Sequence, residues 1–235
     1  MIHVRLWAEP ARRSTCNVTW IGVLVGATVR GMGLWTDHVV PRIANKALGT
    51  AEVRAMRERV CAGLSGEVVE IGFGSGLNVP HYPSSVIRVE AVEPSDVGWK
   101  LGAERLAAAT VPVQRAGLDG QKLPFADDSF DCALSTFTMC TIPDLEAALS
   151  ELRRVLRPGG TLHFVEHGKA PDASVLRWQK RIEPLYSPMA GGCRLSRPID
   201  ELVSAAGFTI ERVDAGYVPK DPKPFGYVYE GVARS

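Results

Sequence analysis

One stretch constrains the fold more than any other, an apolar run that leads through an acidic residue into a glycine-rich turn, Val68-Val69-Glu70-Ile71-Gly72-Phe73-Gly74-Ser75-Gly76. The run has the length and β-branched content of a buried parallel strand. The glycines lack Cβ atoms, so the chain can turn sharply and bring backbone N–H groups close to a ligand. Their spacing is G-x-G-x-G, which differs from the G-x-G-x-x-G of the dinucleotide fingerprint. The carboxylate of Glu70 would repel a phosphate, so the stretch favours a ligand that carries an amino group or a sulfonium.

The composition fits one ordinary globular domain with a full hydrophobic core, since the 235 residues are 46% hydrophobic and 23% charged. A formal net charge of +1 gives no electrostatic reason to expect a nucleic-acid partner. The five cysteines are odd in number and form no C-x-x-C pair, which predicts a reducing compartment such as the cytoplasm and neither a disulfide framework nor a zinc site. They are Cys16, Cys61, Cys132, Cys140 and Cys193.

The N-terminus carries a short apolar run at 18–29, which follows two arginines and is closed by Arg30. The run is similar to the hydrophobic part of a signal peptide, but no small-x-small cleavage pattern stands out. Its twelve residues are fewer than the ~20 needed to span a bilayer. Two interpretations stay open. The one that we favour is a buried or surface helix, or a chain whose translation starts at Met32. The other is a peripheral membrane anchor. We predict that residues 1–31 are an extension that is dispensable for folding and that residues 32–235 form one domain.

Apolar runs and helical patterns alternate along the rest of the chain, which is typical of an α/β fold with a parallel sheet. The predicted strands lie at 68–71, 86–92, 111–115, 131–136 and 161–168, with predicted helices at 51–60, 96–109 and 198–206 and another between Asp144 and Pro158. Leu145, Leu149, Leu152 and Leu156 give the last of these an apolar stripe that predicts core packing. Two further strands, 208–215 and 226–232, are predicted to form an antiparallel pair.

Acidic residues follow the first three predicted strands. Glu93 ends the second strand, 23 residues after Glu70, where a carboxylate can accept hydrogen bonds from both hydroxyls of a ribose. A solvated residue before a helix capped by Ser95 is the plainer interpretation. Asp119 follows the third strand and can accept from the exocyclic amine of adenine, although Asp119-Gly120 alone would predict a turn. Together with 136–140, these residues converge on the carboxyl edge of the sheet, where doubly wound folds bind ligands.

The segment 171–196 interrupts the alternation and is rich in aromatic and small residues, among them Trp178, Tyr186 and Gly191-Gly192-Cys193. An insertion after the fifth strand would lie over the ligand crevice. We therefore predict that it forms the acceptor pocket, and a packed surface excursion is the alternative.

Several motifs in order resemble those of the class I S-adenosylmethionine-dependent methyltransferases. They are Glu70 to Gly76, Val92-Glu93-Pro94, Leu123-Pro124-Phe125 with Ser129-Phe130-Asp131, and Arg154 to Gly160, within a resemblance that covers about residues 60–235. The resemblance implies a Rossmann-like, doubly wound, mostly parallel seven-stranded sheet whose last strand is antiparallel. It also implies S-adenosylmethionine as cofactor. The implied cofactor site consists of Glu70, Gly72, Phe73, Gly74, Ser75, Gly76 and Asn78 near the methionine end, Glu93 and Pro94 near the ribose, Asp119 and Gly120 near the adenine, and Thr136.

Within that superfamily the chain resembles the methyltransferase-like thiol S-methyltransferases and their bacterial relatives. The segments that carry this resemblance are 135–140, Glu166-His167, Gly192-Cys193 and 225–227. It implies methyl transfer to a small, lipophilic acceptor, with a thiol as one candidate. The alternatives are a quinone-precursor or phospholipid/amine methyltransferase, and a non-catalytic module that binds S-adenosylmethionine. Whether the chain contacts a membrane peripherally depends on the role of the apolar run at 18–29, so that question stays open as well.

His167, beside Glu166 at the end of the fifth strand, is our candidate catalytic residue. It could assist deprotonation of the acceptor or orient it, and a structural histidine is the alternative. His163 and His167 have an H-x-x-x-H spacing, but no third ligand lies near them in the sequence, so we predict no metal site. Cys140 and Cys193 are predicted to be small buried residues and not nucleophiles.

Overall fold

A seven-stranded sheet organises the computed structural model, which describes residues 33–235; the apolar run at 18–29 lies outside them. The strand order is β3-β2-β1-β4-β5-β7-β6, and β7 runs antiparallel to both of its neighbours while the pairs from β3 to β5 are parallel. The strands are β1 (Gly66–Ile71), β2 (Val86–Val92), β3 (Val113–Gly117), β4 (Phe130–Thr136), β5 (Leu156–His167), β6 (Thr209–Tyr217) and β7 (Tyr227–Arg234). The predicted fold class is therefore confirmed.

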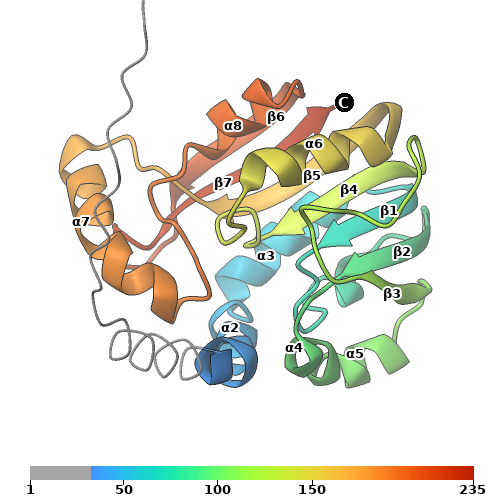
Figure 1. Cartoon of the computed structure of the whole chain (residues 1–235), viewed down its shortest axis with the longest axis horizontal. Coiled ribbons are helices and arrows are strands. Elements are labelled where there is room, and N and C mark those ends of the chain that lie inside the picture. Colours follow the sequence, from blue (N-terminus) through green and yellow to red (C-terminus); the bar gives the residue numbers. More distant parts are fainter. Residues whose placement is uncertain (1–32) are drawn as a thin grey trace, which may run out of the picture.

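Helices cover both faces of this sheet (Figure 1). They are η1 (Trp35–Val39), α2 (Val40–Ala47), α3 (Ala51–Cys61), η2 (Val79–His81), α4 (Asp96–Leu101), α5 (Ala103–Ala107), α6 (Leu145–Val155), α7 (Ala173–Met189) and α8 (Ile199–Ala205). α6 and α8 pack on one face, and α3 with α4 and α5 packs on the other. α7 stands apart at one end of the sheet, on the left in Figure 1. Within residues 33–235, no helix is both long and apolar enough to cross a membrane.

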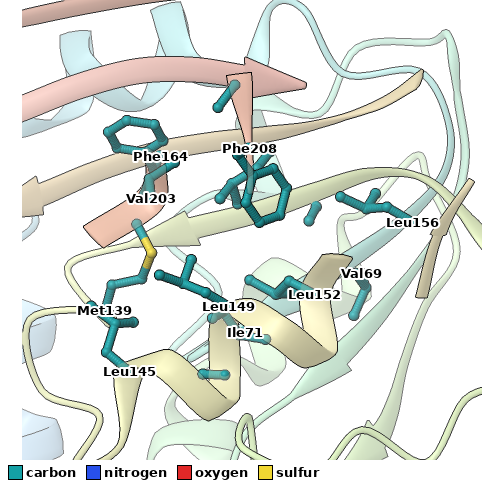
Figure 2. Packing of buried hydrophobic residues seen from close by; sticks show 14 of the residues in the cluster. Val69, Ile71, Met139, Leu145, Leu149, Leu152, Leu156, Phe164, Val203 and Phe208 are labelled. Carbon is teal, nitrogen blue, oxygen red and sulfur yellow. The ribbon is translucent and has the colours of Figure 1, made fainter. Parts of the chain in front are cut away.

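The two faces of the sheet bury separate hydrophobic clusters, because successive side chains of a strand point to opposite faces. In β1, Val69 and Ile71 belong to the cluster under α6, whereas Val68 belongs to the cluster under α3. Figure 2 shows the first cluster, in which Leu149 and Leu152 of α6 lie with aromatic side chains from the sheet side. The predicted leucine stripe is core, although its last member, Leu156, is the first residue of β5 and not part of the helix.

Two helix boundaries show how sequence patterns relate to packing. Thr50 caps α3, since its Oγ1 accepts a hydrogen bond from the Val53 N–H at 3.4 Å. The single helix predicted over 96–109 is wrong, because the chain breaks at Gly102 into α4 and α5. A Cβ at Gly102 would lie 2.9 Å from the carbonyl oxygen of Ser75, so glycine lets this helix approach the loop that follows β1.

The segment 171–196 consists of α7, which contains Pro184 and Pro188, and a turn with positive φ at Gly191 and Gly192. Trp35 Nε1 donates a hydrogen bond to the Met189 carbonyl oxygen at 3.0 Å, so the end of α7 contacts the N-terminal helices. The segment thus joins the far end of the sheet to η1 and α2.

We expect Leu149→Ala to lower the free energy of unfolding by about 2–5 kcal/mol, because the fully buried side chain leaves a cavity under α6. Leu185→Ala in α7 is a matched control, since that side chain is 77% exposed and its loss should change stability by less than about 0.5 kcal/mol. Urea unfolding followed by circular dichroism measures both. Equal effects of the two variants would contradict this description of the core.

Candidate cofactor and acceptor site

The loop after β1 needs its glycines, because Gly72, Gly74 and Gly76 have φ values of +68°, +59° and +70°. A Cβ at Gly72 would lie 2.0 Å from Oγ1 of Thr138, so the loop is pressed against the segment that follows β4. A Cβ at Gly74 would meet only the Gly72 carbonyl oxygen, at 3.9 Å. The backbone is therefore tightly held on one side and approachable above Gly74, which is the form of a cradle for a ligand.

The first turn of α4 lies directly against this loop. A Cβ at Gly98 would be 3.2 Å from the carbonyl oxygen of Gly74, and Gly102 makes a similar approach to Ser75. Ser75 Oγ also donates to Oδ1 of Asn45 in α2 at 2.7 Å. The contribution of Gly98, Gly102 and Asn45 was missed from the sequence, although two glycines four residues apart in a helical pattern are a usable signal of close backbone contact.

Glu93 joins the ends of β1 and β2. Its Oε2 accepts a hydrogen bond from the Gly74 N–H at 2.5 Å, and its Oε1 accepts one from the Ser95 N–H at 2.7 Å. Burial raises the pKa of this carboxyl group, and the two backbone hydrogen bonds oppose the rise. Glu93 is thus buried at the carboxyl edge predicted for it, where it orients the loop after β1.

A buried polar network lies beneath the glycine loop. Glu70 is 1% exposed and accepts hydrogen bonds from Asn78 Nδ2 at 2.9 Å and from the hydroxyl of Tyr82. Arg57 Nη1 donates to Oδ1 of Asn78 at 2.7 Å and to Oγ1 of Thr136 at 2.6 Å. The network brings together three predicted site residues, Glu70, Asn78 and Thr136, and adds two that were not predicted.

The two charged groups of this network are both strongly desolvated. Burial raises the pKa of Glu70 to about 7, against the lowering effect of the hydrogen bonds from Tyr82 and Asn78. Burial also lowers the pKa of Arg57, whose Nε has no hydrogen-bond partner within the described residues. An arginine stays protonated in proteins, so Arg57 places an incompletely paired cation beneath the loop. Its place on the apolar face of α3, between Val53 and Val60, was the signal available in the sequence.

The remaining predicted cofactor residues differ in exposure. Phe73 is buried against Trp99 with ring centroids 4.9 Å apart, so its side chain is core. Pro94 is exposed. Asp119 is also exposed, and its Oδ1 accepts from the Gln121 N–H at 2.9 Å in a local turn. Gly120 lies close to the end of β1, since a Cβ there would be 3.8 Å from Ile71.

The segment after β4 is held by a second buried carboxylate. Glu166 is fully buried and accepts hydrogen bonds from Ser135 Oγ at 2.8 Å, the Thr138 N–H at 2.9 Å and the Cys140 N–H at 3.1 Å. Burial raises its pKa, and these hydrogen bonds oppose the rise. Within the segment Phe137 has a φ of 56°, which is uncommon outside glycine. Glu166 therefore fixes a tight turn that a free chain would rarely adopt.

Arg197 holds the same turn from the other side. This buried guanidinium donates to the carbonyl oxygens of Met139, Ile142 and Pro143. Its role was not predicted, because an arginine before a helix gives no sign in the sequence of partners more than fifty residues away. The segment 137–143 is consequently fixed by one anion and one cation.

His167 lies at the end of β5 and is half-buried, with its ring centroid 4.8 Å from that of Phe137. Its Nδ1 is 3.9 Å from Sγ of Cys193, which is 3.6 Å from Sγ of Cys140. The hydrogen bond between the two thiols lowers the pKa of Cys193 and raises that of Cys140. Both cysteines are buried as predicted, but they adjoin His167. His163 does not belong to this group. Its ring Nδ1 is hydrogen-bonded to the Val60 carbonyl oxygen at 3.0 Å, so this histidine is structural.

Comparison with known proteins agrees with this geometry. A family model described as a methyltransferase domain matches residues 69–164. Thiol S-methyltransferase TMT1B of Rattus norvegicus is 30% identical over 175 residues, which cover 72% of this chain and 69% of the relative. Phosphatidylethanolamine N-methyltransferase of Cereibacter sphaeroides is 32% identical over 130 residues, which cover 50% of this chain and 60% of the relative. Demethylmenaquinone methyltransferase of Thermobifida fusca (strain YX) is 28% identical over 180 residues, which cover 72% of this chain and 70% of the relative.

Solved structures support the fold. A SAM-dependent methyltransferase from Aquifex aeolicus aligns with a TM-score of 0.58 and 19% identity, over 83% of this chain and 97% of that one. Geranyl diphosphate methyltransferase in complex with SAM aligns with a TM-score of 0.59 and 15% identity, over 77% and 84%. The chain thus shares the α/β fold of these structures and has a glycine-rich loop at the carboxyl edge of its sheet. The chain belongs to the class I S-adenosylmethionine-dependent methyltransferases. S-adenosylmethionine is its cofactor, as the sequence motifs implied.

We expect Glu70 to make the stability of the fold depend on pH. Because burial raises the pKa of Glu70 from 4.5 to about 7, the folded chain keeps a proton that the unfolded chain has already lost between those values. The stabilisation is present at low pH and is lost as the pH rises through about 7. Relative to Glu70→Gln, wild-type stability should fall by on the order of 3 kcal/mol over this interval.

Urea unfolding of the wild type and Glu70→Gln between about pH 5 and about pH 8 measures this difference. Glu146→Gln, which replaces an exposed carboxylate on the solvent side of α6, is the control and should change stability equally at every pH. A difference between the wild type and Glu70→Gln that stays constant with pH would contradict the buried, protonatable state of Glu70.

Proposed function

We propose that the chain transfers a methyl group from S-adenosylmethionine to a thiol on a small, lipophilic acceptor. The observation that carries the proposal is the apolar surround of His167 at the carboxyl edge of the sheet. Phe137 lies on one side of the ring, and an apolar cluster from α7 and the loops lies beyond the neighbouring cysteines. Its members are Cys140, Cys193 and Leu195, with Ile182, Tyr186, Ala190 and Phe225 packed against them. The similarity to thiol S-methyltransferase TMT1B also supports a thiol acceptor.

The cofactor fits the residues on the other side of this edge. The approachable backbone above Gly74 suits the methionine portion, and the carboxylate of Glu93 suits the ribose hydroxyls. Asp119 and Gly120 would adjoin the adenine, with Pro94 beside the ribose. Arg57 would face the carboxylate of the methionine portion, since its Nε has no partner within the described residues. A cavity of about 490 Å³ that Arg57 lines is also bordered by Lys46, Arg54 and Arg105, which makes its surroundings cationic.

The protein's contribution to methyl transfer is to orient the acceptor and exclude water. When bound, S-adenosylmethionine supplies a methyl group on a sulfonium, whose positive charge disappears as the methyl leaves. A dry site therefore favours the transition state over the ground state. The apolar cluster at α7 would exclude water and position the acceptor sulfur in line with the methyl group. A thiol with a pKa near ~8.5 loses its proton more readily than an alcohol, and His167 lies where it could receive that proton or orient the sulfur.

Other acceptors have support of their own. The likeness to phosphatidylethanolamine N-methyltransferase favours an amine head group, and the likeness to demethylmenaquinone methyltransferase favours a quinone precursor. An amine or an activated ring carbon does not need soft sulfur and imidazole groups beside it, so the thiol is the acceptor that best suits the surroundings of His167. A non-catalytic binding module would not need an apolar cluster beside the edge where we place the cofactor.

We also propose a reducing, cytoplasmic location with peripheral contact to membranes. Cys61, Cys132, Cys140 and Cys193 are all free. Large apolar side chains are exposed on the N-terminal helices and α7, namely Leu34, Trp35, Ile43, Trp178, Leu185 and Met189. A lipophilic acceptor dissolved in a bilayer would be reached across such a surface.

Glu93→Ala should weaken binding of S-adenosylmethionine by roughly tenfold to a hundredfold, because a carboxylate that accepts hydrogen bonds at the ribose is lost. Isothermal titration calorimetry measures the dissociation constant. Glu211→Ala on β6 removes a carboxylate that instead pairs with Arg234, and it should leave affinity unchanged. Wild-type affinity in Glu93→Ala would remove Glu93 from the cofactor site.

Turnover tests the acceptor. Purified chain with S-adenosylmethionine should produce S-adenosylhomocysteine when given an apolar alkanethiol, and much more slowly with an amine lipid or a quinol of similar size. Mass spectrometry of the products identifies the methylated atom. Faster transfer to the amine or the quinol would replace the thiol with that acceptor, and cofactor binding without turnover on any of them would favour the binding module.

A further inference from the structure

Three ligating side chains meet beside the predicted acceptor site. Cys140 comes from the turn after β4, His167 from the end of β5 and Cys193 from the turn after α7. Their two sulfur atoms and one imidazole nitrogen all lie within 4.8 Å of one another. Three segments far apart in the sequence thus place two thiols and an imidazole around one point.

Two of the three separations between these atoms are close to those around a tetrahedral zinc ion. With Zn–S bonds of about 2.3 Å and Zn–N bonds of about 2.0–2.1 Å, tetrahedral angles put two sulfurs about 3.8 Å apart and a sulfur about 3.6 Å from a nitrogen. The observed separations are 3.6 Å between the sulfurs and 3.9 Å between Cys193 Sγ and His167 Nδ1. The third pair, Cys140 Sγ and the ring nitrogen of His167, lies within 4.8 Å, so an ion would draw the imidazole toward Cys140.

The backbone around the cluster is fixed before any ion is bound. Glu166 accepts from the Cys140 N–H at 3.1 Å, and the Arg194 N–H donates to the Cys140 carbonyl oxygen at 2.8 Å. Gly192 has a φ of +94°, and a Cβ there would be 2.9 Å from the Thr141 carbonyl oxygen, so glycine is needed for the two turns to approach. Cys140 and Cys193 are therefore held together by main-chain contacts that do not depend on their thiols.

We propose that Cys140, His167 and Cys193 bind a zinc ion whose fourth position takes the sulfur of the acceptor. Within residues 33–235 the group contains three ligating side chains, which is the number found in catalytic zinc sites with an open position. The cysteines are buried, while His167 is half-buried and packs against Phe137. The role of the fourth position rests on the proposed thiol methyl transfer, whereas binding of the ion does not.

The chemistry balances without a further reactant. The acceptor thiol loses its proton to solvent as its sulfur coordinates the zinc, because a coordinating thiol is deprotonated. A lone pair of that sulfur forms the new bond to the methyl carbon. The bond between the methyl carbon and the sulfonium breaks, and its electron pair stays on the departing sulfur. The products are a thioether and S-adenosylhomocysteine, and His167 acts as a ligand in place of a base.

Metal binding tests the site without any methyl transfer. Full-length reduced chain incubated with zinc and desalted should retain one zinc per chain by mass spectrometry of the metal. Cobalt in place of zinc should give a sulfur-to-metal charge-transfer band. Cys140→Ser, Cys193→Ser and His167→Ala should each weaken binding by roughly tenfold or more in competition with a chelator. Cys132→Ser is the matched control, since this cysteine is also buried but lies against Thr161.

Circular dichroism confirms that each variant is folded. No retained metal in the reduced wild type, or equal retention in Cys132→Ser and Cys193→Ser, would overturn the zinc site. An apolar thiol added to the cobalt form without cofactor should shift the charge-transfer band, and an unchanged band would overturn the acceptor position. Retained metal in a chain that methylates no thiol would leave the zinc site standing and refute the thiol activity instead.

Discussion

The structure depends on a carboxyl group and a guanidinium that are buried beneath the glycine loop and joined by a single amide. A buried carboxylate or guanidinium is costly unless its hydrogen-bonding capacity is met. Asn78 donates to Glu70 and accepts from Arg57, so it links the end of β1 to α3 without a direct ion pair. Thr136 at the end of β4 accepts from both Arg57 and Asn78. Three elements are thereby fixed at the point where the glycine loop begins, and loss of Asn78 would remove a hydrogen-bond partner from Glu70 and Arg57 at once.

The second buried carboxylate connects the two halves of the site. Glu166 orders the turn after β4, and Thr138 in that turn donates from Oγ1 to the Gly72 carbonyl oxygen at 3.3 Å. Cys140 lies two residues further on, beside His167. One short segment therefore touches the glycine loop at one end and the cluster of Cys140, His167 and Cys193 at the other. Arg197 donates hydrogen bonds to the carbonyl oxygens of Met139 and Ile142 in this segment. The segment therefore has little freedom to move independently of the glycine loop or of His167.

Sequence patterns predicted those features of the fold that depend only on residues close together in the chain. The strand, the glycine turn and the acidic residue at the end of β2 are encoded within a few residues, so Glu70, Gly72 and Glu93 fell at the expected edge. Arg57 and Arg197 were missed because their partners are distant in sequence, and arginines are expected to be solvated. The break at Gly102 depends on a loop that packs against the helix, which no helical pattern records. In the sequence the nearest histidine to His167 is His163, and those two alone do not make a metal site. In the structure His167 lies instead beside two cysteines that are 53 residues apart in the sequence.

The acceptor side presents a conflict that the Cys140, His167 and Cys193 cluster can resolve. A dry site assists the loss of sulfonium charge, but the same burial raises the pKa of a thiol, as it does for Cys61 in this chain. A lipophilic thiol drawn into the apolar surround of α7 would therefore tend to stay protonated and unreactive. An imidazole packed against Phe137 would have to hold a positive charge in the same apolar surroundings in order to act as the base. A zinc ion bound by two thiolates and a neutral imidazole carries no net charge, and it can stabilise the acceptor as a thiolate without requiring water. The features that exclude water from the site are thus the ones that make a bound cation useful there.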